Sequence, residues 1–465
     1  MPTSLFGSFG FRHGVHPPEL KSATAHLAIR RMPYPSEVVL PLRQHAGKPA
    51  KLIVREGDTV LRGDVIAEPD GFVSAPVHAS ASGRVVEIGL WPHPDGSMDT
   101  AVRIAVDRFS PQVPRPRMVP RWESLTPGEI VLAVQSGGVV GLGGAAFPTH
   151  VKLAPPPGIT IETIILNGAE CEPYLTTDHR IMVEYPARVY LGARIMMRAL
   201  GAKRVVIGVE KNKPDAIAAL ERTLPTDVDI TILPLTVKYP QGAEKMLIKT
   251  VLGREVPSGK LPASLGVVVQ NVGSAASIAE IFDTGLPLLE RIVTVTGPGV
   301  RRPSNLIVPI GTKLRDLLAM CGGMTEDAEE IIFGGPMMGV AQANLDVPVV
   351  KGTTGVVVLT TADTNPVDTY PCIRCGSCLD ACPVFLNPSL LADLAKKGRY
   401  DELEKMHIND CMLCGSCSFV CPSKIPLAQL FQSSKSAIRK RNAERLRREA
   451  DAAAAAVGPG IVSAA

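Results

Sequence analysis

The sequence predicts a multidomain α/β protein that ends in a small, cysteine-rich helical domain. Three observations predict it: short alternating apolar runs up to residue 107, apolar strands alternating with helical segments between residues 126 and 285, and two cysteine repeats near the C-terminus. The 465 residues are enough for about three domains of ordinary size. With 45% hydrophobic and 20% charged residues, the chain can bury sizeable cores.

The bulk composition excludes several classes of protein. The net charge of +4 is mild and predicts no nucleic-acid partner. Eight of the ten cysteines lie in the two repeats, and Cys171 and Cys321 stand alone, which indicates a reducing compartment. We find no apolar segment typical of a signal peptide in residues 1–21 and no run of 18 apolar residues, so we expect attachment to any membrane to occur through partners.

Residues 1–35 form a polar, proline-rich N-terminal arm, which we expect to pack irregularly on another domain. Residues 36–107 predict a β domain, since short apolar runs are separated by Gly-Asp turns at Gly57 and Gly63. The predicted strands are Glu37–Leu40, Ala50–Val54, Val65–Ala67, Arg84–Ile88 and Ala101–Val106. This pattern resembles the barrel-sandwich (lipoyl-like) fold of carrier domains, but the hairpin tip Glu68–Val73 has no lysine. The resemblance therefore implies the fold without the carrier chemistry.

Residues 126–285 predict a Rossmann-like α/β domain after a linker rich in Pro and Arg. Buried strands alternate with helices, which implies a parallel sheet covered on both faces. The predicted strands are Thr163–Leu166, Arg204–Val209 and Ile230–Leu233, and the predicted helices are Pro186–Leu200, Pro214–Thr223 and Gly242–Leu252. Residues 291–345 return to short strands around one helix, Thr312–Cys321.

The C-terminal part, residues 362–432, holds two copies of C-x-x-C-x-x-C-x-x-x-C-P, with short helices predicted at Leu390–Lys397 and Tyr400–Met406. This spacing is typical of ferredoxin domains that hold two 4Fe–4S clusters, in which the fourth cysteine of each copy serves the other cluster. One cluster would take Cys372, Cys375, Cys378 and Cys421, and the other would take Cys382, Cys411, Cys414 and Cys417. We expect the fourth cysteine to stand at the start of a helix. Zinc knuckles or a disulfide framework are the alternatives.

Residues 433–465 form a basic and alanine-rich tail. Its segment Lys435–Glu449 carries seven basic and two acidic residues with helical propensity. The segment is interpreted either as a solvated helix or as a surface for anionic lipid or an acidic partner.

A glycine-rich loop is the second chemical feature, with five glycines in the eight residues 137–144. Glycines let the backbone approach a phosphate or a flat ring closely, and Gly141, Gly143 and Gly144 are our candidates for that contact. The loop is neither a P-loop nor a standard dinucleotide fingerprint, and a tight structural turn is the alternative.

An amide and two carboxylates, Asn167, Glu170 and Glu172, follow a predicted strand. Strand ends of this kind bind ligands in doubly wound sheets. The carboxylates would suit ribose hydroxyls or a flavin ring. Alternatively, they cap the next turn or are solvated.

These segments resemble the flavin- and NADH-binding subunit of respiratory complex I. The match includes the glycine loop with Phe147-Pro148-Thr149 and Lys152, then Asn167 and Glu170–Pro173, and later Tyr239–Lys245 and Gln270–Val272. Residues 293–314 look like the β-grasp, SLBB-like domain of that subunit. The resemblance implies that Lys152, Asn167, Glu170 and Asn271 bind FMN, and that Phe147, Glu172 and Glu244 face NADH. It implies no catalytic acid–base residue, because hydride transfer needs none.

The order of domains, with Gly334–Gly339 and the His16–Glu19 leader, is similar to that of the C subunit of the Rnf (Rsx) ion-translocating electron-transport complex. The resemblance implies NADH:ferredoxin oxidoreduction coupled to ion transport, with two 4Fe–4S clusters and FMN as cofactors. It further implies a peripheral location on the cytoplasmic side of the bacterial inner membrane. The implied partners are the other subunits, especially an iron–sulfur subunit, with ferredoxin served indirectly.

Three positions depart from the family pattern. Ala146 stands where the loop often has glycine, Leu142 replaces a basic residue of the complex I loop, and Cys171 replaces a serine. A methyl group at position 146 would crowd a flavin if that residue needs a positive φ. Two other functions stay open: a scaffold that transfers electrons without its own NADH site, and the diaphorase subunit of a soluble hydrogenase or formate dehydrogenase.

Overall fold

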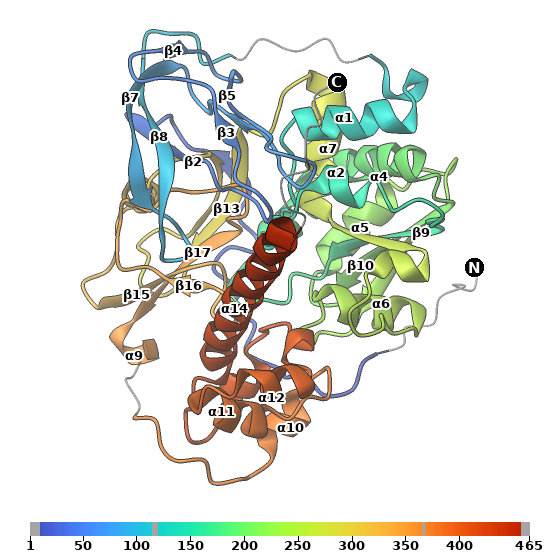
Figure 1. Ribbon diagram of the computed structural model, residues 1–465. Helices are drawn as coiled ribbons and strands as arrows, with labels where there is room; N and C mark the ends of the chain where they lie inside the picture. The colour runs from blue at the N-terminus through green and yellow to red at the C-terminus, as the bar shows by residue number, and fades with distance from the viewer. Residues whose placement is uncertain (1–9, 114–119, 365–367, 457–465) are drawn as a thin grey trace, which may run out of the picture. The chain divides into compact units, whose positions relative to one another are not determined.

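The computed structural model describes residues 10–113, 120–364 and 368–456, and the chain divides into two compact units (Figure 1). Of the described residues, 10, 11, 16–113 and 120–364 form the larger unit. Residues 12–15 and 368–456 form the smaller unit. No helix among the described residues combines the length and the apolar character needed to cross a membrane.

The β domain of the larger unit is a sandwich of two sheets, as predicted. One sheet has the order β2-β8-β7-β4, and the other has the order β3-β5-β6. The strands are β2 Glu37–Pro41, β3 Lys51–Leu52, β4 Thr59–Val60, β5 Val65–Glu68, β6 Val77–His78, β7 Gly83–Pro92 and β8 Met98–Val106. The core between these sheets also contains Val140 and Leu142 of the glycine loop. The loop and the β domain therefore share one hydrophobic core.

The α/β domain is built on a parallel sheet with the order β11-β10-β9-β12. Its strands are β9 Thr163–Gly168, β10 Arg204–Glu210, β11 Ile230–Leu235 and β12 Val267–Asn271. Alternate strand residues enter two separate cores: Ile164 and Leu166 on one face, Ile165 on the other. The predicted burial of the sheet on both faces is confirmed.

The helices around this sheet include four that the sequence did not predict. The predicted ones are α4 Pro186–Leu200, α5 Pro214–Arg222 and α6 Glu244–Leu252; the others are α1 Pro127–Ser136, α3 Thr177–Glu184 and α7 Val272–Thr284, with the short α2 Thr149–Lys152. A capping box of Thr126 and Glu129 begins α1 and is visible in the sequence. α7 follows β12 without a connecting loop, which hides the boundary between the strand and the helix.

The β-grasp domain recruits strands from beyond residues 291–345. Its sheet has the order β1-β14-β13-β17-β15-β16, with helix α8 Leu314–Met320. The strands are β1 Ile29–Arg31, β13 Glu290–Thr296, β14 Ser304–Pro309, β15 Ala328–Phe333, β16 Val340–Ala341 and β17 Gly355–Thr360. The arm is therefore not irregular throughout: β1 pairs in parallel with β14. The prediction missed β1 because three largely exposed residues carry no local strand pattern.

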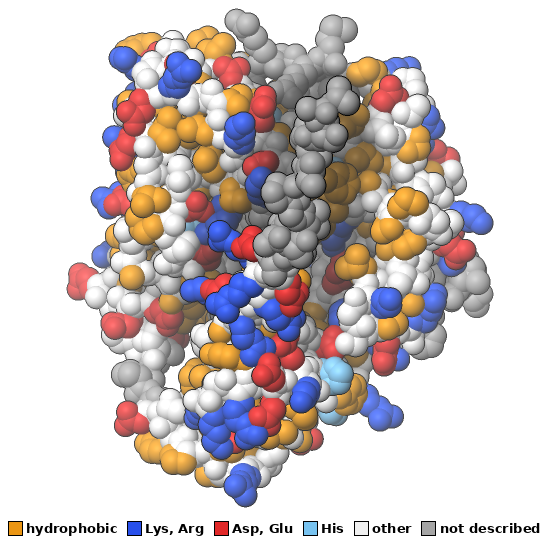
Figure 2. Space-filling view, viewed as in Figure 1, with side chains coloured by type: hydrophobic (Ala, Val, Ile, Leu, Met, Phe, Trp, Pro, Cys, Tyr) orange, Lys and Arg blue, Asp and Glu red, His pale blue; other side chains and the backbone are white. Residues whose placement is uncertain are grey.

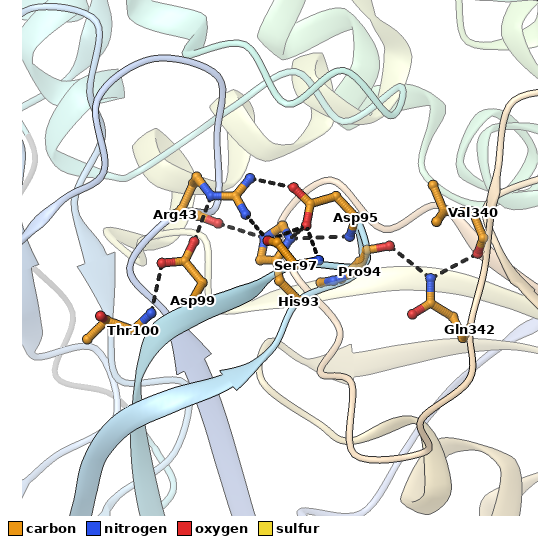
Figure 3. Close-up of polar contacts among 9 residues, drawn as sticks. All are labelled: Arg43, His93, Pro94, Asp95, Ser97, Asp99, Thr100, Val340 and Gln342. Carbon is orange, nitrogen blue, oxygen red and sulfur yellow. Dashed lines mark hydrogen bonds and ion pairs between the residues drawn. The ribbon is translucent and has the colours of Figure 1, made fainter. Parts of the chain in front are cut away.

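Polar contacts join the β sandwich to the β-grasp domain at the turn between β7 and β8 (Figure 3). Arg43 Nε donates to Asp99 at 2.6 Å, and Arg43 Nη1 donates to Asp95 at 2.6 Å. Gln342 Nε2 of the β-grasp domain donates to the Pro94 carbonyl at 2.8 Å. Arg43 thus stiffens the turn whose Pro94 carbonyl accepts the hydrogen bond from Gln342.

The smaller unit is helical: α10 Ser377–Ala381, α11 Pro388–Lys396, α12 Tyr400–Lys405, α13 Ser416–Phe419 and α14 Leu427–Ala456. The two helices predicted between the cysteine repeats are confirmed as α11 and α12. The basic segment lies within α14, which begins before the predicted tail does, and Lys and Arg side chains gather along its described part (Figure 2). Residues 12–15 also pack on this unit, where the His13 ring lies 4.5 Å from the Phe385 ring.

Candidate functional site

The smaller unit brings four cysteines of different repeats around one pocket. Cys382 of the first repeat lines this pocket with Cys411, Cys414 and Cys417 of the second. The remaining lining is apolar, including Leu391 and Phe431. This set is the crossed one that the spacing predicts, and the donors fit a 4Fe–4S cluster, which cysteine sulfurs hold in a dry pocket. Among the described residues, no three His, Cys, Asp or Glu side chains converge on a single metal ion.

The two repeats have matching backbones. Gly376 and Gly415 have positive φ angles, as do Arg374 and Leu413, each one residue ahead of the second cysteine of its repeat. The predicted position of the fourth cysteine was wrong: Cys382 caps the C-terminus of α10. The helix begins at Ser377, right after Gly376, so the three residues that separate Cys378 from Cys382 fill one helical turn.

Burial raises the pKa of three of the pocket cysteines, Cys382, Cys411 and Cys417. Burial, and then the neighbouring Cys414, raises the pKa of Cys417 to about 12. Cluster assembly therefore has to displace protons from these sulfurs, which couples cluster binding to pH.

In the larger unit, Asn167 and Asn271 face each other at the carboxyl ends of two neighbouring strands. Asn167 is on β9, Asn271 is on β12, and the two are register partners. From β9 the chain proceeds to β10 and β11 on one side, and it returns to the other side of β9 with β12. This reversal makes the crevice between their ends the topological switch point, where open α/β sheets bind ligands.

The glycine loop closes on itself beside this crevice. Gly141 N donates to the Phe147 carbonyl at 2.8 Å, and Ala146 N donates to the Gly141 carbonyl at 3.1 Å. Between them, Gly143 and Gly144 are exposed, and a Cβ atom on Gly143 would lie 3.3 Å from Asn271 Nδ2. In the described part of the chain, the amides of residues 143–145 donate to no protein acceptor. Exposed amides next to a ligand crevice fit the phosphate of a nucleotide cofactor.

The loop tolerates its two departures from the family pattern. Ala146 has a φ of +48°, so the left-handed backbone that favours glycine is present, at a cost of about 1 kcal/mol. Its methyl group packs against the β-sandwich core and would lie 3.1 Å from a Cβ atom on Gly352. Leu142 is buried, and its carbonyl accepts a hydrogen bond from Arg291 at 3.0 Å.

Glu170 caps a helix, which is one of the two alternatives left open by the sequence. Its carboxylate accepts hydrogen bonds from the amides of Asp178 and His179 at 2.8 and 3.0 Å, in the first turn of α3. The Asp178 carboxylate accepts from Asn271 Nδ2 at 2.6 Å. Burial, and then the charge of Glu170, raises the pKa of Asp178 to about 7. The two acids, which are partly buried, and the buried Asn271 thus form one polar group beneath the crevice.

The remaining predicted residues make separate contacts around Asn167 and the glycine loop. Asn167 Nδ2 donates to the Gly242 carbonyl at 2.8 Å, and Lys152 Nζ contacts Glu244 at 2.6 Å. Glu172 accepts from the Met337 amide at 3.1 Å, so it contacts the Gly334–Gly339 loop of the β-grasp domain. Burial raises the pKa of Glu172 to about 7. Phe147 is half-buried and closes the glycine loop through its carbonyl.

Four charged residues near the site carry no sequence motif, and sequence reasoning missed them. Lys21 of the arm donates to the carbonyls of Glu172 and Leu175, and Lys351 donates to the Gly138 carbonyl. Asp178 and Arg291 are the other two. Lys21, Arg291 and Lys351 are buried and Asp178 is partly buried, and of the four only Lys351 follows an apolar run as a single charge.

Models of four families match successive parts of the chain. They are the RnfC barrel sandwich hybrid domain (residues 9–108), the Nuo51 FMN-binding domain (134–280), the SLBB domain (292–341) and the 4Fe-4S dicluster domain (368–425). The fold and the two sites define an electron-transfer subunit that uses FMN and two 4Fe–4S clusters.

Curated relatives resolve the family. The chain is 46% identical over 398 residues to the C subunit of the proton-translocating ferredoxin:NAD(+) oxidoreductase complex of Clostridium ljungdahlii, covering 85% of this chain and 86% of the relative. It is 43% identical to the C subunit of the Na(+)-translocating complex of Acetobacterium woodii, covering 86% and 90% of the two chains. A third relative, from Rhodobacter capsulatus, is 43% identical and covers 94% and 85%. This chain belongs to the family of C subunits of ion-translocating ferredoxin:NAD(+) oxidoreductase (Rnf) complexes.

Among solved structures, the H2-reduced NAD+-reducing NiFe hydrogenase superposes with a TM-score of 0.47 at 20% identity. The superposition covers 68% of this chain and 65% of the hydrogenase chain.

Proposed function

We propose that this chain is the NADH-oxidising subunit of a membrane-bound NADH:ferredoxin oxidoreductase of the Rnf type. It takes electrons from NADH at FMN and passes them through two 4Fe–4S clusters to partner subunits, coupled to ion transport. It works as a peripheral subunit on the cytoplasmic side of the membrane. FMN supplies the conversion of a two-electron hydride into single electrons, which clusters accept one at a time.

One observation carries the proposal: an exposed glycine loop next to the asparagine pair at the switch point. In this assignment the amides at Gly143 and Gly144 receive the FMN phosphate, with Gly141 shaping the turn. Lys152, Asn167, Glu170 and Asn271 surround the rest of the cofactor.

The charges of this site suit the assignment. Glu170 is held at the positive end of α3, and Lys152 is paired with Glu244, so neither carboxylate stands as a bare negative charge beside the phosphate. On the nicotinamide side, Phe147 offers a flat apolar surface, and Glu172 and Glu244 offer acceptors for the hydroxyls of NADH. No residue has to move a proton for hydride transfer itself.

The smaller unit supplies the way out for electrons. Cys382, Cys411, Cys414 and Cys417 would hold one cluster in the apolar pocket, and Cys372, Cys375, Cys378 and Cys421 would hold the other. A dry pocket of this kind excludes water from the sulfurs, and this exclusion helps to set the reduction potential of the cluster.

Turnover by the isolated holoprotein tests the proposal. Anaerobically purified chain with FMN and both clusters is mixed with NADH and an artificial electron acceptor. We expect NADH oxidation at a rate that Glu244→Ala lowers by about tenfold or more, with the iron content unchanged. Reduction of the clusters only after addition of a separate flavoprotein would contradict the proposal and support the scaffold alternative.

A further inference from the structure

We propose that residues 72–76 of the β sandwich form a fixed clamp on the glycine loop. Lys351 and His150 are the positioning residues that bind this segment. This segment runs from the hairpin tip at which carrier domains of the same fold present their modified lysine. The inference rests on the proposed role of the glycine loop in FMN binding, and it assigns a function to a domain that the electron path does not use.

Alternate carbonyls of this segment accept hydrogen bonds from the neighbouring domains. The Phe72 carbonyl accepts from His150 Nε2 at 2.7 Å, and the Pro76 carbonyl accepts from Lys351 Nζ at 2.7 Å. Between them, the Ser74 carbonyl accepts from Gln135 Nε2 at 3.5 Å. Since a carbonyl only accepts, His150 holds its ring proton on Nε2. The Phe72 ring also packs edge-on against the His150 ring, with centroids 5.6 Å apart.

The donors act on both ends of the glycine loop. Lys351 Nζ also donates to the Gly138 carbonyl at 2.8 Å, at the start of the loop. His150 lies on α2, three residues after Phe147. Ala46 N of the β sandwich donates to the carbonyl of Ala146, inside the loop, at 3.1 Å. Three points of the loop are therefore tied to the β sandwich: Gly138 through Lys351, Ala146 directly, and the helix that follows the loop through His150.

Burying the Lys351 side chain costs desolvation free energy, which argues that this contact has a specific role. Its side chain is fully buried, and burial lowers its pKa to about 7. An apolar side chain would avoid that desolvation but would leave two buried carbonyls without a donor. A Cβ atom on Gly138 would lie 2.7 Å from the Lys351 Nζ, so the glycine and the lysine are fitted to each other.

The clamp fixes where the free amides of residues 143–145 stand. Among the described residues, no backbone hydrogen bond fixes these three from within the loop, because the loop closes only through Gly141, Ala146 and Phe147. A phosphate site made of backbone amides gains affinity from being held in place before the ligand arrives. We therefore expect FMN affinity to depend on side chains that do not contact FMN.

FMN titration of the full-length, flavin-depleted chain with both clusters in place tests the clamp. We expect Lys351→Met and His150→Leu each to weaken FMN binding at least tenfold, followed by flavin fluorescence quenching. His150→Gln retains an amide donor and should restore most of the affinity. Tyr190→Phe is the matched control: it removes another buried hydrogen bond to a carbonyl, that of Leu220, at 2.7 Å and far from the loop in the sequence. It should lower the melting temperature and leave FMN affinity unchanged.

The outcomes separate the clamp from the flavin site itself. Unchanged FMN affinity in His150→Leu, with a melting temperature lowered as in Tyr190→Phe, would overturn the clamp and leave the flavin site standing. Unchanged affinity in Gly143→Asp as well would overturn the flavin assignment on which the clamp rests. If Lys351→Met does not fold, the comparison of His150→Leu with His150→Gln decides.

Discussion

The cluster unit and the proposed flavin site each hold a cofactor, but the first uses residues close together in the sequence and the second uses residues far apart. All eight proposed cluster ligands lie between Cys372 and Cys421, and a glycine of positive φ shapes each loop. The proposed flavin site and its supports draw on residues from Lys21 to Lys351, contributed by the arm and by three domains. The first arrangement survives as a short motif that can be moved between proteins. The second exists only when the whole larger unit has folded.

The largest effect is expected in the cluster unit. Cys382→Ala and Cys411→Ala should remove the same cluster, because both sulfurs line one pocket, whereas Cys378→Ala should remove the other. Iron should fall from about eight to about four per chain in each variant, with FMN retained. EPR of the reduced protein identifies the lost cluster, and Cys321→Ala, which changes a buried cysteine outside the repeats, should keep both. If Cys382→Ala instead lost the same signal as Cys378→Ala, the crossed assignment would be wrong.

In the flavin site, Gly143→Asp should abolish FMN retention with both clusters intact. The new side chain would begin 3.3 Å from Asn271 Nδ2 and place a negative charge at the proposed phosphate position. Flavin absorbance of the purified chain measures it. Gly128→Asp is the control, since a Cβ atom there meets nothing within 4 Å and an acid suits the first turn of α1. Loss of FMN in both variants would indicate a general defect.

A smaller, pH-dependent effect is expected from the buried acid beneath the crevice. The folded chain holds the proton of Asp178 between about pH 4 and pH 7, whereas the unfolded chain releases it near pH 4. Its contribution to stability is therefore greatest in acid and declines as the pH rises through that window. Asp178→Asn removes the decline, so its melting temperature should match that of the unchanged chain near pH 4 and exceed it at pH 8.

Other charges also face Asp178, namely Glu170, Arg291 and Lys213, and they are unchanged in the variant. Asp215→Asn offers the opposite sign. Burial alone would raise the pKa of Asp215, but the hydrogen bond and charge of His179, with two backbone amides, together lower it. That variant should lose stability above about pH 4. Equal pH profiles for the two variants would rule out this account of the buried group.

The smallest effect is expected at the turn between β7 and β8. Arg43→Ala should cost about 1 kcal/mol or less, because its ion pairs with Asp95 and Asp99 are partly exposed. FMN and iron contents should not change. A loss of FMN in this variant would show that FMN binding also depends on the β7–β8 turn, outside the proposed clamp.

The two regions also differ in how much of them the sequence predicts. The cysteine spacing predicts which residues meet, because ligands on one short loop leave the chain little choice. Asn167 and Glu170 were found because they end a recognisable strand, and Asn271 was found only through the family resemblance. Its pairing with Asn167 depends on β12, which runs directly into α7 with only its last residue, the N-cap Asn271, at the boundary.

The failures follow from the same cause. β1 is a strand only because β14 offers it an edge, and Arg291 and Lys351 act on carbonyls of residues that lie 149 and 213 positions away. A backbone carbonyl has the same chemistry at every position, so nothing in the sequence marks the one that a distant cation will contact. The helix-start position of Cys382 was wrong for a local reason, since one helical turn fits between it and Cys378.

The strand order of the β-grasp sheet has a consequence for biosynthesis. β1 is among the first segments to leave the ribosome, yet β14, its neighbour, is made near residue 304, and β17 is inserted beside β13 only after residue 355. In the nascent chain, β1 therefore stays unpaired through most of translation. Chaperones that shield exposed strand edges would be needed most during that interval, before Gly355–Thr360 emerges to complete the sheet.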